Sequence, residues 1–220
     1  MKKISVTLVA LFVCITLSAQ YKKASFLEKE GRTYAIGTRM YAMGDGKGSP
    51  LGYFLGFGKD ADGKQLFTWW EFQFIPSYKF SFETANYDGL PIVVDGTTKA
   101  TFIYAYNFGY HLLKNESAEQ KIKPYVTAGF NMKAFGGVKE SYYNDGSNKK
   151  SVPETAWGFG IGGGAGCMYN ITSWLALKVE GGYMHQFNFT PEDNADHESY
   201  FLFTSHPYAS AGLRFRLVQD

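Results

Sequence analysis

The sequence predicts an all-β fold, namely an eight-stranded antiparallel up-and-down transmembrane β-barrel. Large apolar side chains occupy every second position of segments such as 99–112, and successive residues of a strand point to opposite faces. The intervening residues are mostly small, polar or charged. A small barrel has little room for so many rings, so we expect the apolar face to point outward to lipid. The composition, with 18% aromatic residues and 25 glycines, agrees with this pattern.

Eight strand-like segments follow one another, and no segment has the pattern of an amphipathic helix. We expect the strands at about 31–43, 51–58, 66–84, 99–112, 124–133, 155–169, 175–189 and 200–217. Pro76 predicts an irregularity in the third strand, because proline has no ladder donor.

The connections between these strands differ in length. Residues 85–98, 139–153 and 190–199 are predicted to be long loops, and residues 60–63 a turn. Long connections follow the third, fifth and seventh strands, as expected for the external side of a membrane barrel. The short connection after the first strand is an exception.

The first residues predict export. Residues 1–19 have the pattern of a secretory signal peptide, which leaves residues 20–220 as one barrel domain. Its removal takes away two of the 22 basic residues and none of the 20 acidic ones, so the mature chain is formally neutral. Nothing in this charge pattern predicts nucleic-acid binding. Cys167 is the one cysteine left, so an intramolecular disulfide is excluded.

The end of the chain carries a specific pattern, Ser-Ala-Gly-Leu-Arg-Phe-Arg-Leu at residues 210–217. It is similar to the closing-strand signal of small Gram-negative outer-membrane β-barrels of the eight-stranded OmpA/OmpX kind, with Gly212, Phe215 and Leu217 at the signal positions. Three further residues follow, where many members of that family end at an aromatic residue. Residues 123–130 resemble a strand start common in these barrels, and no peptidoglycan-binding domain follows.

This resemblance implies the chain's surroundings. It implies an outer-membrane location, contact with lipid and lipopolysaccharide, and assembly by the barrel-insertion machinery. It also implies a structural or interaction role through long external loops, with a surface or envelope protein as a candidate partner. No cofactor is implied.

Six charged residues fall on the predicted inner face. They are Arg39, Glu71, Lys133, Lys178, Glu180 and Arg214. Buried charges must be paired, because an unpaired one costs several kcal/mol. We expect Lys178, Glu180 and Arg214 to lie at a similar depth. A salt-bridge network that fills the lumen is favoured over a narrow ion-conducting channel, because eight strands leave room for side chains only.

Aromatic residues at the inner strand ends, Tyr125, Tyr169 and Trp174, are predicted to form an interfacial girdle. The glycines of the G-x-G-x-x-G pattern at 158–163 fall inside a predicted strand, so we interpret them as in-facing positions that give room to long side chains.

Three alternatives stay open at this point. His197-Glu198-Ser199 has the His-x-Ser spacing of an outer-membrane lipid A deacylase, although spacing alone does not establish a nucleophile and its base. The acidic segment 192–198, with His206 nearby in sequence, is a candidate divalent-cation site, for which a solvated loop is the simpler interpretation. A secreted soluble barrel that binds a ligand in its interior is the third. The favoured prediction is a protein that is not an enzyme.

Overall fold

The computed structural model describes residues 30–43, 48–61, 64–85, 91–113, 120–144, 149–151, 154–189 and 205–218. Eleven strands lie in these ranges: β1 (Glu30–Tyr41), β2 (Leu51–Ala61), β3 (Leu66–Ile75), β4 (Lys79–Ala85), β5 (Pro91–Thr98), β6 (Thr101–His111), β7 (Ile122–Asn144), β8 (Lys149–Ser151), β9 (Glu154–Asn170), β10 (Leu175–Phe189) and β11 (Ser205–Val218). Among the described residues, no helix is long and apolar enough to cross a membrane.

Eight of these strands close into an antiparallel barrel. The ring runs β1-β2-β3-β6-β7-β9-β10-β11 and returns to β1, and each strand pairs with both of its neighbours in this order. The first and last strands close it, since Gly31–Tyr41 pairs with Val218–Tyr208. The predicted eight-stranded barrel is confirmed.

The outer wall of the barrel is apolar and the inner wall is mixed. On β6, Phe102 and Phe108 are 49% and 46% exposed, whereas Ile103 and Ala105 between them are buried. Rings on neighbouring strands cover one another, as where Trp70 stacks on Tyr104 with ring centroids 5.0 Å apart. The same exposure recurs at Leu55, Phe72, Phe130, Phe159, Leu177 and Tyr183. The prediction of an outward apolar face is therefore confirmed.

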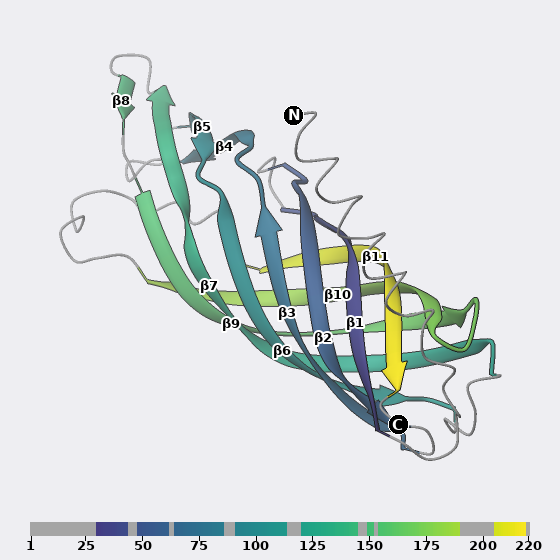
Figure 1. The fold of residues 1–220 in the computed structure, drawn as a ribbon. Coiled ribbons are helices and arrows are strands. Elements are labelled where there is room, and N and C mark those ends of the chain that lie inside the picture. The colour runs from purple at the N-terminus through teal and green to yellow at the C-terminus, as the bar shows by residue number, and fades with distance from the viewer. Residues whose placement is uncertain are drawn as a thin grey trace, which may run out of the picture.

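Three strands lie beyond the barrel wall. The β4–β5 hairpin pairs through β5 with the far end of β7, and β8 pairs with the same part of β7. In Figure 1 these strands gather at the upper left, away from the C-terminus where β11 ends. We call their end of the barrel the loop end, and the opposite end, with the β2–β3 and β9–β10 turns, the turn end.

These extensions correct two predicted loops. Residues 85–98 include strand β5, and residues 139–153 include the last part of β7 and strand β8. The long third segment divides into β3 and β4 around Pro76, where an irregularity was predicted. The turn expected at 60–63 begins later, because β2 continues to Ala61.

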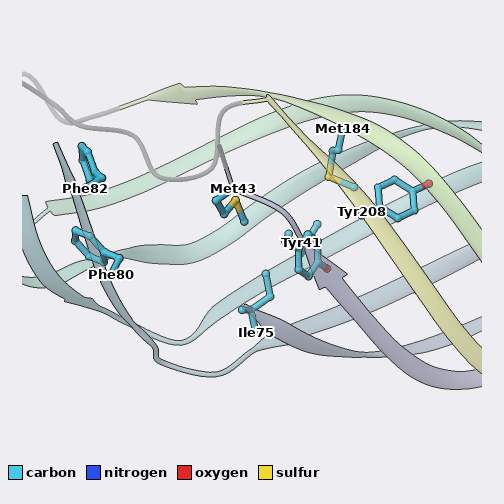
Figure 2. Close-up of a cluster of buried hydrophobic side chains, with 8 residues drawn as sticks. Tyr41, Met43, Ile75, Phe80, Phe82, Met184 and Tyr208 are labelled. Atoms are coloured by element: carbon cyan, nitrogen blue, oxygen red, sulfur yellow. The ribbon is translucent and has the colours of Figure 1, made fainter. Parts of the chain in front are cut away.

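An apolar cluster lies in the barrel at the loop end. Phe80 and Phe82 of β4 are buried there with Ile75, Met184 and Tyr208, which come from β3, β10 and β11. Figure 2 shows Phe80 and Phe82 next to each other on one strand, Met43 between them and Tyr41, and Tyr208 further along the barrel. The cluster anchors the β4–β5 hairpin to the barrel. We call it the loop-end apolar cluster; its members are Tyr41, Met43, Ile75, Phe80, Phe82, Ile103, Met184 and Tyr208.

Candidate functional site

The interior of the barrel holds a central charge cluster of Arg39, Glu71, Lys178 and Glu180. Arg39 Nη1 lies 2.7 Å from Glu71 Oε1, and Arg39 Nη2 lies 3.8 Å from Glu180 Oε1. Lys178 Nζ lies 3.2 Å from Glu180 Oε2. All four residues are buried. Their side chains point inward because successive residues of a strand point to opposite faces, and each of the four has an outward apolar neighbour in the chain.

Tyrosine hydroxyls complete the coordination of Glu180. Tyr208 Oη donates to Oε1 at 2.8 Å, and Tyr125 Oη donates to Oε2 at 3.0 Å. Each carboxylate oxygen therefore receives one phenol and one cation. This arrangement compensates the loss of water around a buried carboxylate.

The other members of the cluster also have packed partners. Gln73 Nε2 donates to Glu71 Oε1 at 2.7 Å, and the Tyr41 hydroxyl donates to Gln73 Oε1. The guanidinium of Arg39 lies 4.4 Å from the centroid of the Tyr208 ring. The lumen at this level is thus filled by interlocked polar and aromatic groups.

A second ionic group lies nearer the turn end. Arg214 Nη2 is 2.5 Å from Asp60 Oδ2, and His111 Nε2 is 3.6 Å from Asp60 Oδ1. We call Asp60, His111 and Arg214 the turn-end cluster. On β10, Arg214 faces Ala176, four residues from Glu180, which is a separation of about 13 Å along a strand.

The three residues expected at one depth therefore lie at successive levels of the wall, since the Arg214 level on β10 is two residues from Lys178 and four from Glu180. The expected common depth does not hold between Arg214 and Glu180. The carboxylate partner of Arg214, Asp60, was missed because it was assigned to a turn. Every second residue of β2 faces inward, and this series runs through Phe54, Gly56, Gly58 and Asp60. Extending the alternation by one step would have predicted that Asp60 faces the lumen.

An aromatic layer separates the two charged groups. Phe67, Trp69, Tyr125 and Met168 form this buried cluster, and Lys178 Nζ lies 4.4 Å from the centroid of the Trp69 ring. The interfacial assignment of Tyr125 is wrong: its side chain is 0% exposed. Tyr125 occupies an inward position of β7, and its hydroxyl donates to Glu180. It therefore lies inside the barrel, although it is near the end of a strand.

Glycine gives room for this layer. A Cβ at Gly166 of β9 would collide with the Tyr125 hydroxyl, and one at Gly109 of β6 would collide with the Phe67 ring. The glycines at 158–163 likewise lie within strand β9, as interpreted from the sequence.

The remaining predicted residues lie as follows. Lys133 of β7 is buried in the barrel, nearer the loop end than the central charge cluster. In the same part of the barrel, Gln186 Nε2 donates to Asn131 Oδ1. Tyr169 is 46% exposed on the outer wall, and Trp174 is half-buried in the β9–β10 turn.

The residues of the closing-strand pattern, Gly212, Phe215 and Leu217, all lie on β11. Phe215 is buried, and Trp174 stacks beside it with ring centroids 6.4 Å apart. Their role as an assembly signal stays a prediction.

Several sequence predictions lie outside the described residues. These are the signal peptide at 1–19, the acidic segment at 192–198, and the pair His197 and Ser199. His206, by contrast, is buried on β11, so its side chain faces the lumen.

Small cavities lie among the described interior residues. Two cavities of about 20 Å³ each lie there, one beside Trp69 and Lys178 and the other beside Asp60 and Arg216. Each volume suits about one or two water molecules. Around these two cavities the described interior side chains are packed and paired.

Comparison with known proteins supports this architecture. No family model and no curated protein matches the chain. The crystal structure of a major outer membrane protein from Thermus thermophilus is similar, with 14% identity, coverage of 86% of this chain and 99% of that one, and a TM-score of 0.52. At this identity the match shows the fold alone: the chain has the fold of outer-membrane β-barrels.

Two further solved structures match a similar share of this chain. Neisserial surface protein A is 12% identical over 84% of this chain and 96% of that one, with a TM-score of 0.48. The N-terminal β-barrel domain of Pseudomonas aeruginosa OprF is 14% identical over 88% of this chain and all of that one, with a TM-score of 0.42.

Proposed function

We propose that this chain is an integral outer-membrane barrel that does not conduct ions and that acts through the surface of its loop end. The observation that carries the proposal is the sidedness of the wall: apolar rings are exposed outside, while charges are buried and paired inside. A soluble barrel would have the opposite arrangement, because exposed apolar surface of this extent is unfavourable in water. Lipid is the solvent that fits.

The packed lumen supports a role other than transport. Arg39, Glu71, Lys178 and Glu180 pair with one another across the interior, and the loop-end apolar cluster lies above them. Breaking a buried ion pair is strongly unfavourable. An ion would have to displace these contacts in order to pass.

Conductance measurements test this part of the proposal. The refolded barrel in planar lipid bilayers should give no stable current steps above the lipid baseline. Heat-modifiable gel mobility of the same sample shows that the barrel is folded. Reproducible steps from folded protein would contradict a closed lumen.

The loop end is the part suited to interaction. Beyond the wall, β4, β5, β8 and the end of β7 form a protruding sheet, whose β4 residues Lys79, Ser81 and Glu83 are exposed. The long connections leave the barrel at this end, which is the external side in membrane barrels of this type. The protruding sheet is thus the surface offered to partners outside the cell.

Site-directed labelling tests this orientation. With Cys167 replaced by alanine, Ser81→Cys on β4 should react with a membrane-impermeant maleimide on intact cells. Ser173→Cys, which is exposed at the turn end, is the matched control and should react only after the outer membrane is permeabilised. Labelling in the reverse order would contradict the proposed orientation.

A further inference from the structure

A histidine and a serine on the outer wall are hydrogen-bonded to each other near the loop end. His185 of β10 lies directly opposite Ser205 of β11, and its Nδ1 is bonded to the Oγ of that serine. Both side chains face outward, because their chain neighbours Met184 and His206 are buried on the inner face and successive strand residues point to opposite faces. The pair therefore lies on the side of the wall that the proposed function assigns to lipid.

Apolar side chains surround this pair. Phe187, two residues further along β10, meets the His185 imidazole edge to face, with ring centroids 4.6 Å apart. Tyr183 is 53% exposed, and Ile161, which lies opposite His185 on β9, is 56% exposed. His185 and Ser205 are themselves half-buried. The imidazole is thus held between a hydroxyl and a ring, beside surface that suits acyl chains.

The pair lies at a depth where the esters of membrane lipids occur. Trp174 directly precedes Leu175 at the turn end, and tryptophan is enriched at membrane interfaces. From Leu175 opposite Phe215 to His185 opposite Ser205, the two paired strands advance by ten residues. A tilted strand crosses the hydrocarbon core in about 9–11 residues. On the membrane location of the proposed function, the pair therefore lies where acyl chains meet headgroups.

A serine hydroxyl bonded to an imidazole is the combination that acyl transfer needs. In the imidazole tautomer with its proton on Nε2, the Nδ1 atom accepts the hydroxyl hydrogen bond. Because a serine hydroxyl is a weak nucleophile by itself, it needs an adjacent base to take its proton as the oxygen attacks a carbonyl carbon. His185 is in the position of that base.

We propose that Ser205 and His185 hydrolyse acyl esters of membrane lipids, with Ser205 as the nucleophile and His185 as the general base. Ser205 Oγ bonds to the acyl carbon while its proton passes to His185, the ester C–O bond breaks, and the leaving alcohol oxygen takes that proton. Water then gives a proton to His185 and its hydroxyl to the acyl carbon, the bond from that carbon to Oγ breaks, and Oγ regains the proton. The net reaction converts an ester and water into a fatty acid and an alcohol. This pair is distinct from His197 and Ser199, which lie outside the described residues.

Covalent labelling of the refolded full-length barrel in uncharged maltoside micelles tests the proposal. An alkyl fluorophosphonate, which reacts with activated serines, should form an adduct that peptide mass spectrometry locates on Ser205. Ser205→Ala should lose this adduct. His185→Gln should slow the labelling of Ser205 at least tenfold, because a positioned base contributes about 10²–10⁴-fold to such reactions. A hydrogen bond with a merely structural role would leave Ser205 unlabelled.

The matched control is Ser173→Ala. Ser173 is exposed at the turn end, so this variant should be labelled on Ser205 like the parent protein. Gel mobility verifies folding, and His185→Asn replaces His185→Gln if the latter does not fold.

Fatty-acid release identifies the source of the ester. Folded protein is incubated with phosphatidylglycerol and, separately, with lipid A in mixed micelles, and the released fatty acids are measured by mass spectrometry. Release from either lipid that Ser205→Ala abolishes supports the proposal and identifies the substrate. An absent adduct on Ser205, equal labelling in His185→Gln, or release from neither lipid overturns it. The micelle assays need no membrane orientation, which Ser81→Cys labelling reports separately, so failure of the proposed orientation is distinguishable from failure of this proposal.

Discussion

Glu180 is the residue on which the contacts of the central charge cluster converge. It receives Tyr125, Tyr208, Lys178 and Arg39 on its two carboxylate oxygens. A neutral side chain here would leave Lys178 without this ion pair in a buried position. Lys178 therefore depends on this carboxylate, whereas Arg39 keeps its 2.7 Å pair with Glu71.

Replacing Glu180 with glutamine should destabilise the barrel by about 3–5 kcal/mol, because it breaks a buried ion pair by removing one partner. The matched control is Glu83→Gln on β4, which is exposed and should change the free energy of unfolding by less than about 0.5 kcal/mol. Urea-induced unfolding in lipid vesicles measures both variants. Equal stabilities would show that Glu180 is not held in an ionic network.

For single residues, the sequence predicted which charged side chains face inward but not which of them form ion pairs with one another. Alternation with period two shows which side chains point inward, and it placed the six predicted charges there. Which of them meet depends on strand stagger around the ring, and the sequence does not show stagger. Arg214 therefore pairs with Asp60, 154 positions away along the chain, and not with Glu180.

The β4–β5 hairpin is the element that differs most from sequence expectation. Its strands exist because β5 pairs with the extended end of β7 and because Phe80 and Phe82 enter the loop-end apolar cluster. These are tertiary contacts, and short strands have little local signal without them. The long barrel strands were predictable, since each carries the alternation over many residues.

Removing these anchors should release the hairpin while leaving the barrel closed. A Phe→Ala change in a packed cluster costs about 3–5 kcal/mol, so Phe80→Ala and Phe82→Ala should each raise the rate of proteolytic cleavage within the hairpin at least tenfold. Ser81→Ala, whose side chain is exposed between them, is the control and should cleave like the parent protein. Cleavage of all three variants at one rate would mean that the cluster does not hold the hairpin.

The whole molecule is a barrel with layers along its axis. From the turn end, the interior passes from the turn-end cluster through the aromatic layer to the central charge cluster and then to the loop-end apolar cluster. Ionic and aromatic layers alternate, so each charged group lies against rings as well as counter-charges. This layering, together with the lipid proposed to lie outside, accounts for the slightly negative mean hydropathy, −0.22, of a proposed membrane protein.

Trp69 and Trp70 provide the most direct measurement, because adjacent residues of β3 face opposite sides of the wall. Trp69 is 7% exposed and packs in the aromatic layer, whereas Trp70 stacks on Tyr104 of the outer wall. Two variants, each keeping one of these tryptophans and with all others changed to phenylalanine, are folded into vesicles containing brominated phospholipid. Fluorescence of Trp70 should be strongly quenched and that of Trp69 nearly unchanged. Stronger quenching of Trp69 than of Trp70 would mean that the wall is turned the other way.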